Sequence, residues 1–139
     1  MKKIVSIILF LFVVLLITGC GKSSGTIICK SEARGENPTI VNYEKYVVKN
    51  NKVVEYIKYN NLSYSEEYLS KIPMSTILEV YEKEEDLTVE KIDSKSIKTT
   101  FKNPRNYYED IESDNMLETI RASLEDNAFN IYAYTCEIE

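Results

Sequence analysis

The chain has 139 residues, eleven tyrosines, no histidine and no tryptophan, and its formal net charge is −5. This length suits one small domain. The acidic balance argues against nucleic-acid binding, which needs clustered Lys and Arg. The absence of histidine removes the commonest general base and the commonest zinc ligand, so Ser-His-Asp and Cys-His sites are excluded, whereas Ser-Lys and carboxylate mechanisms are not.

The first twenty residues have the order of a secretory signal. A positive start at residues 1–3 is followed by an apolar run over residues 4–17 and by the small residues Thr18 and Gly19. This order is typical of a cleaved signal peptide. A bilayer-spanning helix needs about 20 apolar residues, so the shorter run fits a membrane span less well.

Residues 17–20, Ile-Thr-Gly-Cys, resemble the lipobox of bacterial lipoproteins. In that family a diacylglyceryl group is attached to the cysteine thiol and the signal is removed. The resemblance therefore implies that Cys20 is lipidated and becomes the first residue of the mature chain. Two acyl chains anchor a soluble domain stably, because each buried methylene contributes about 0.8 kcal/mol. The alternative is an ordinary signal peptide in which the cysteine stands by chance.

We therefore expect a signal peptide over residues 1–19, a lipidated cysteine with a flexible tether over 20–25 and a single domain over 26–139. Loss of the two signal lysines changes the formal net charge from −5 to −7. The domain is expected on the extracytoplasmic face of the cell membrane, held there by its lipid. Gly21 follows the cysteine, which by resemblance to diderm sorting rules permits the outer membrane if the host has one.

Two cysteines remain in the expected mature domain, Cys29 and Cys136. An even count in an exported domain favours a disulfide. Closing a loop of about 100 residues is worth roughly 4–5 kcal/mol in the chain-entropy model. Two separate buried thiols are the alternative. The spacing is unlike C-x-x-C and does not support a thioredoxin-type redox role.

The first half of the domain has strand and hairpin patterns. Residues 26–33 are rich in β-branched side chains, and residues 39–49 and 52–60 flank Asn50 and Asn51. Two consecutive asparagines tolerate the positive φ angles of a two-residue hairpin turn. We therefore expect three strands in this half, the last two joined as a hairpin.

A two-residue turn sets the register expected for the hairpin, with Val48 opposite Val53 and Tyr46 opposite Glu55. One face then collects Tyr46, Val48, Val53, Ile57 and Tyr59, and the other collects Val41, Tyr43, Val47, Val54 and Tyr56. Neither face is clearly polar. The first face is the better candidate for the core.

The next segment is expected to form a helix that starts near Glu66, with Ser63 or Ser65 as its cap. Pro73 should kink or split this helix, because proline removes a backbone donor and crowds the preceding turn. Residues 83–93 are expected to begin as the charged end of the helix and to continue as a short strand, and residues 96–102 are expected to pair with that strand.

The last third of the chain is expected to hold a helix capped by Ser113 or Asp114, and then a closing strand over residues 129–138. The resulting order is β-β-β-α-β-β-α-β. This order predicts an α+β fold in which an antiparallel sheet carries its two helices on one face. A bridge between Cys29 and Cys136 would require the first and last strands to be neighbours.

The layout as a whole resembles the small bacterial lipoproteins grouped as YehR-like. The resemblance rests on the lipobox, the Gly/Lys/Ser tether, the order of strands and helices, and the "LEDNAF" stretch over residues 124–129. Ala128 stands where a glycine would be expected. Cys29 and Cys136 match an early and a late cysteine in related short lipoproteins. The family has no agreed activity, so the resemblance implies no catalytic residues.

The tyrosines are candidates for a binding surface, because aromatic rings offer a large contact area at little entropic cost. Tyr107 and Tyr108 lie in an expected loop and are the first candidates for contact with a ligand. Further members of such a platform for a glycan or a peptide would be Tyr43, Tyr46, Tyr56 and Tyr59. The alternative is that tyrosine suits half-buried strands.

Carboxylates in the last third raise the question of a calcium loop. Asp110, Glu112 and Asp114 have the alternate spacing with which such a loop starts. Asn115 then stands at the glycine position and Arg121 at the position of the final glutamate, so the pattern is not completed. An acidic helix start explains the same residues, because negative charge is favourable at a helix N-terminus. An irregular calcium site stays as the alternative.

The sequence thus predicts a membrane-anchored lipoprotein without enzymatic activity, with no catalytic residues, no metal and no cofactor. Its expected partners are the membrane, through the N-terminal lipid, and a peptide, cell-wall fragment or protein. The alternative is a small cell-envelope hydrolase that uses carboxylates or a Ser-Lys pair. A third hypothesis is a structural or inhibitory partner with no pocket.

Overall fold

The computed structural model describes residues 23–33, 35, 37–126 and 133–139. The expected signal peptide, Cys20 and part of the "LEDNAF" stretch lie outside these described residues. The elements in chain order are β1 (Gly25–Ala33), β2 (Thr39–Lys49), β3 (Lys52–Ser63), α2 (Glu66–Lys71), α3 (Met74–Glu82), β4 (Leu87–Lys91), β5 (Ser96–Phe101), α4 (Met116–Glu125) and β6 (Thr135–Ile138).

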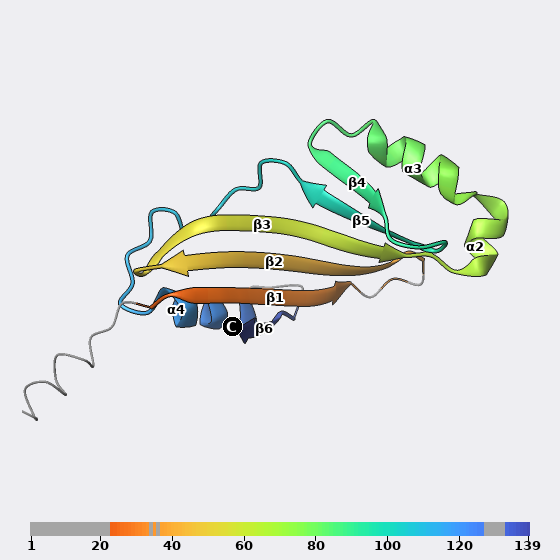
Figure 1. Cartoon of the computed structure of the whole chain (residues 1–139). Helices are drawn as coiled ribbons and strands as arrows, with labels where there is room; N and C mark the ends of the chain where they lie inside the picture. The colour runs from red at the N-terminus through yellow and green to blue at the C-terminus, as the bar shows by residue number, and fades with distance from the viewer. Residues whose placement is uncertain (1–22, 34, 36, 127–132) are drawn as a thin grey trace, which may run out of the picture.

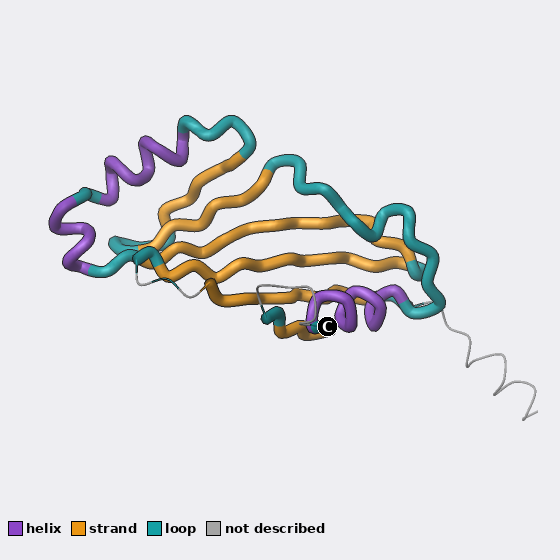
Figure 2. The backbone as a smooth tube through the Cα atoms, turned by 180° about the vertical axis from the view of Figure 1, so that it is seen from behind, coloured by secondary structure: helices purple, strands orange, loops and turns teal. Residues whose placement is uncertain are grey.

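The strands form one antiparallel sheet with the order β4-β5-β3-β2-β1-β6. The long strands β1, β2 and β3 form its middle, and α4 lies against the β1–β6 side (Figure 1). Helices α2 and α3 lie at the end of the molecule that is farther from α4, as Figure 2 shows from behind. The predicted α+β class with an antiparallel sheet is therefore confirmed.

The helices pack on one face of the sheet, in two apolar clusters. Ile40, Tyr46 and Val48 lie on the same face of β2, because side chains alternate along a strand. Tyr46 and Val48 belong to the α4 cluster, with Ile27, Cys29, Tyr108, Met116, Leu117 and Ile120. Ile40 packs against the α3 cluster, which consists of Leu62, Tyr64, Ile77 and Ile97. The expectation that the helices share one face is confirmed.

Pro73 splits the first helical segment, as expected. Helix α2 ends at Lys71, and α3 begins at Met74 with Pro73 as its N-cap residue. The described residues therefore contain three helices where two were expected. Ser65 caps α2, because its Oγ accepts a hydrogen bond of 3.2 Å from the backbone N–H of Tyr68.

The cap expected for the last helix is wrong by one or two residues. Asn115 caps α4, since its Oδ1 accepts a 3.3 Å hydrogen bond from the N–H of Glu118. Ser113 instead lies two residues before this cap, where its Oγ accepts a 3.1 Å hydrogen bond from the N–H of Asn115. Several polar residues precede this helix, so local composition alone does not distinguish them.

The hairpin turn is confirmed, but half of the expected face assignment is wrong. Asn50 and Asn51 have φ angles of 52° and 63°, as a two-residue turn requires. Beyond Val48, which pairs with Val53, the register shifts and Val54 becomes an extra residue. Such a bulge exchanges the two faces of the rest of the strand. Tyr46 consequently pairs with Tyr56 on the helix-covered face, whereas the expected core residues Ile57 and Tyr59 lie on the opposite face.

Strand β1 begins at Gly25, within the segment expected to be a tether. Gly25 lies so close to the C-terminus that a Cβ there would come within 2.9 Å of the Glu139 backbone oxygen.

No helix of the described residues is long and apolar enough to cross a membrane.

Candidate functional site

Polar side chains separate the two apolar clusters on the helix-covered face. Glu44 and Asn42 point to this face from β2, and their partners in register on β3 are Lys58 and Asn60. A polar belt at this place prevents the two clusters from forming one continuous core. The polar belt is also the part of the helix-covered face where protein side chains can form hydrogen bonds or ion pairs with a ligand.

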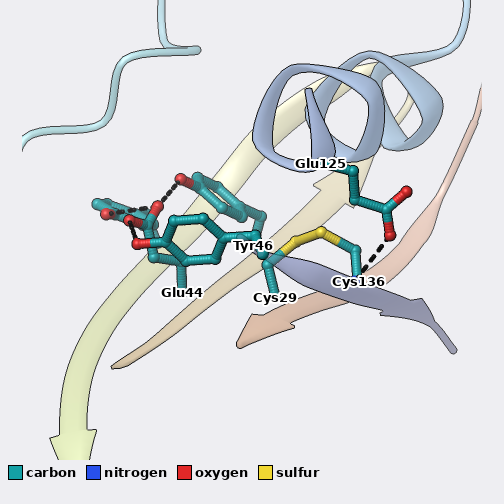
Figure 3. The surroundings of a disulfide bond; sticks show 7 residues. Cys29, Glu44, Tyr46, Glu125 and Cys136 are labelled. Atoms are coloured by element: carbon teal, nitrogen blue, oxygen red, sulfur yellow. Dashed lines mark hydrogen bonds between the residues drawn. A yellow bond between two sulfur atoms is a disulfide. The ribbon is translucent and has the colours of Figure 1, made fainter. Parts of the chain in front are cut away.

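Glu44 is the buried centre of this belt, with only 8 % of its surface exposed. Its carboxylate accepts hydrogen bonds from three phenols: Tyr46, Tyr56 at 3.2 Å and Tyr134 at 3.1 Å (Figure 3). The Lys58 ammonium lies 4.0 Å from it. A buried carboxylate is costly unless its oxygens are hydrogen-bonded, and here the phenols meet that need.

The phenols of Tyr46 and Tyr56 stay protonated and so remain donors at neutral pH. Burial, and then the hydrogen bond to the Glu44 carboxylate, raise the pKa of Tyr46 well above its usual range. The pKa of Tyr56 is raised too, first by burial and then by the negative charge of Glu44. The ring of Tyr46 stacks on that of Tyr56 with centroids 4.6 Å apart.

The disulfide holds one of these phenols in place. Cys29 and Cys136 are directly opposed on β1 and β6 with their Cα atoms 4.0 Å apart, so the predicted bridge is confirmed. Cys29 also pairs with Glu44 across β1 and β2, so the two residues are neighbours on adjacent strands, and the Tyr46 side chain lies between the disulfide and the carboxylate (Figure 3). Tyr134 precedes Cys136 by two residues, and the bridge therefore limits how far its phenol can move from Glu44.

A half-open pocket of about 370 Å³ lies next to the polar belt. Three of its walls are aromatic: Tyr56 from β3, Phe101 from the end of β5, and Tyr107 from the loop that follows. The remaining lining residues are Lys58, Asp86, Asn103, Pro104 and Arg105. Because Tyr56 and Lys58 also contact Glu44, one wall of the pocket is fixed by the buried network.

The pocket contains two cations that differ in their neighbours. Lys58 lies between the Glu44 carboxylate and the Phe101 ring, 5.4 Å from the ring centroid. Arg105 lies over the Tyr107 ring at 5.1 Å, and no carboxylate of the described residues is within 4.0 Å of its guanidinium. Among the described lining residues, Arg105 is thus the cation whose charge is not balanced by an ion pair.

The tyrosines singled out from the sequence do not form one platform. Tyr107 is 67 % exposed and lines the pocket, whereas Tyr108 is 7 % exposed and packs edge-on against Tyr46 in the α4 cluster. Tyr43 and Tyr59 stack on the opposite face of the sheet with centroids 4.7 Å apart. Sequence reasoning thus found two pocket residues, Tyr56 and Tyr107, and missed Arg105, for which the only local signal is a cation two residues before an exposed tyrosine.

The acidic residues before α4 are not arranged as a metal site. No group of three or more His, Cys, Asp or Glu side chains that could hold a metal ion occurs among the described residues. Comparisons of the chain with protein-family models, with curated proteins and with solved structures found no match.

Proposed function

We propose that the protein is a lipid-anchored binding module that acts on the extracytoplasmic side of a bacterial membrane and has no enzymatic activity. The lipobox-like residues 17–20 support the anchor, and a disulfide is typical of a domain that works in an oxidising compartment. The resemblance to YehR-like lipoproteins stays a prediction.

We further propose that the pocket binds an anionic group carried on a ring. The observation that carries this proposal is Arg105, an unbalanced guanidinium in a pocket of an acidic chain. A guanidinium has a planar set of donors that matches carboxylate and phosphate groups. Phe101 and Tyr107 would pack against the faces of a ring, which favours a peptide carboxylate beside an aromatic residue, or an acidic sugar, over a bare ion.

The alternative of a carboxylate or Ser-Lys hydrolase has less support. Asp86 is the single carboxylate among the described lining residues, and none of them is a serine. A pair of carboxylates for acid-base work would need two acidic groups that face the same reacting atom. Glu44 is nearby, but its oxygens already accept hydrogen bonds from three phenols.

The test is an NMR titration of the isotope-labelled protein with four probes: phenyl phosphate, glucose phosphate, benzyl alcohol and inorganic phosphate. Phenyl phosphate or glucose phosphate should shift the amide signals of Asn103 and of residues 105–107 at lower concentration than the ring or the anion alone. Arg105→Gln should weaken that binding about tenfold, the loss expected for one charged hydrogen bond.

Arg121→Gln is the matched control, because Arg121 lies on α4 and forms an exposed pair with Glu118. It should leave the titration unchanged. If none of the four probes shifts the pocket signals, the pocket is not a binding site for this class. If benzyl alcohol binds as well as phenyl phosphate, the pocket binds rings and the role given to Arg105 is wrong.

A further inference from the structure

The N-terminal end of the described chain is attached to the β2–β3 turn. The N–H of Ser23 donates to Asn51 Oδ1 at 2.6 Å, and the N–H of Asn51 donates to the Ser23 carbonyl at 2.9 Å. The N–H of Asn50 donates to Ser24 Oγ at 3.0 Å. The hydroxyl of Ser23 also accepts from the N–H of Met116, the first residue of α4, at 3.0 Å. Ser23 is therefore fixed to two elements of the fold.

This attachment leaves little chain between the proposed lipid and the domain. Cys20 and Ser23 are three residues apart in sequence, and a fully extended chain of that length spans at most about 11 Å. The β2–β3 turn and the start of α4 lie at one end of the molecule, and α2 and α3 lie at the other end (Figures 1 and 2). Strand β3 alone extends roughly 35 Å between these ends.

From these observations we propose that the β2–β3 turn is the membrane-facing tip of the lipidated protein and contacts phospholipid headgroups, while α2 and α3 stand away from the bilayer. The proposal rests on lipidation of Cys20 and adds an orientation to it. Lys49 and Lys52 flank the turn and are exposed, and Val54 beside them is 55 % exposed. Exposed lysines next to an apolar side chain suit the boundary between headgroups and acyl chains.

The chain's charge does not favour adhesion along its length. The mature chain carries a formal net charge of −7 once the two signal lysines are lost, and anionic lipid would repel such a domain. The short connection, rather than attraction by the surface, is what keeps the tip near the membrane. The pocket residue Lys58 then stands about 20 Å beyond the turn along β3, so a ligand reaches the pocket from the aqueous phase.

The experiment uses the full chain, produced in a bacterium that processes lipoproteins and placed in phosphatidylcholine nanodiscs with a gadolinium chelate on a fraction of the headgroups. Amide relaxation is measured by NMR along the chain. The enhancement at residues 49–52 should be several-fold larger than at residues 66–82. A Gly-Ser insertion of about 20 residues after Gly21 should abolish the difference, because such a linker spans roughly 25 Å on average.

The same Gly-Ser insertion placed after Glu139 is the matched control and should leave the enhancement unchanged. Equal enhancement at both ends, or a larger enhancement at residues 66–82, overturns the orientation while the lipid anchor stands. A purified protein whose intact mass contains no lipid, and which does not bind the nanodiscs, overturns the anchor and the orientation together.

Discussion

Tyr107 and Tyr108 are neighbours in sequence but face opposite environments. The ring of Tyr107 lies beneath the Arg105 guanidinium at the pocket. The ring of Tyr108 packs edge-on against the ring of Tyr46, with the two centroids 5.3 Å apart and the ring planes nearly perpendicular. One loop thus contributes a side chain to the proposed binding surface and another to the core. The two residues can therefore be used to separate binding from stability.

We predict that Tyr108→Ala lowers the free energy of unfolding by about 3 kcal/mol, because a buried aromatic ring is replaced by a cavity. Tyr107→Ala should change the free energy of unfolding by less than about 0.5 kcal/mol, since its ring is mostly exposed. Chemical denaturation measures both. In the probe titration, Tyr107→Ala should weaken phenyl phosphate binding. A Tyr107→Ala protein that is destabilised as strongly as Tyr108→Ala would mean that the loop is held by both rings.

Loss of the disulfide should destabilise the domain by about 4 kcal/mol, the value expected for a loop of this length. The change to make is the double substitution of Cys29 and Cys136 by Ala, which avoids unpaired thiols. Non-reducing mass spectrometry of the native protein should find this pair two hydrogens lighter than free thiols. Free alkylation of both cysteines in the folded, unreduced protein would contradict the bridge.

Replacing the buried carboxylate tests the phenol network. Glu44→Gln should lower the free energy of unfolding by about 2 kcal/mol, because hydrogen bonds to a charged acceptor are exchanged for weaker ones to an amide. Glu55→Gln, an exposed change on the opposite face of β3, is the control and should have little effect. Equal denaturation midpoints for the two variants would show that the phenols contribute nothing through Glu44.

The tyrosines also predict how stability depends on alkaline pH. The pKa of Tyr46 is raised above its ordinary value of 10.0 in the folded state, chiefly by burial. The folded protein therefore holds this proton where the unfolded chain releases it. The stability contributed by this phenol is complete below about pH 10 and is lost as the pH rises further, by up to about 1.4 kcal/mol per pH unit.

This pH dependence is measured by denaturant unfolding at a series of alkaline pH values, together with the absorbance of phenolate. Fewer tyrosines should ionise in the folded protein than in the unfolded chain. Should all eleven tyrosines titrate together near the ordinary pKa in the folded protein, the buried position of Tyr46 and the half-buried position of Tyr56 would be wrong.

The parts of the fold that the sequence predicted correctly are those with a local cause. Asn50 and Asn51 supply the positive φ angles of the turn, and Pro73 lacks the donor that a continuous helix would need. The pairing of Cys29 with Cys136 could be favoured from the cysteine count, but its geometry needed β1 and β6 to be neighbours. The turn and the helix break each depend on one or two residues, so they can be predicted without knowledge of the rest of the fold, whereas the disulfide also depends on the pairing of β1 with β6.

The bulge at Val54 and the pocket depend on tertiary structure, and no local pattern predicts them. Both faces of β3 carry apolar side chains, so the sequence could not show that Tyr56 shares a face with Tyr46. Lys58 comes from β3, whereas Phe101 and Arg105 come from the end of β5 and the loop directly after it, and the two segments meet because β5 pairs with β3. The spacing of residues along the sequence therefore does not predict a site that is assembled across strands in this way.

Metabolic labelling with radioactive palmitate is the most direct test of the proposal that a lipid anchor on Cys20 holds the domain at the membrane. The native chain should carry the label, fractionate with membranes and begin at Cys20, and Cys20→Ala should accumulate as unlabelled precursor. Persistent label in Cys20→Ala, or a native protein that keeps its whole leader and washes off the membrane unlabelled, would contradict the account.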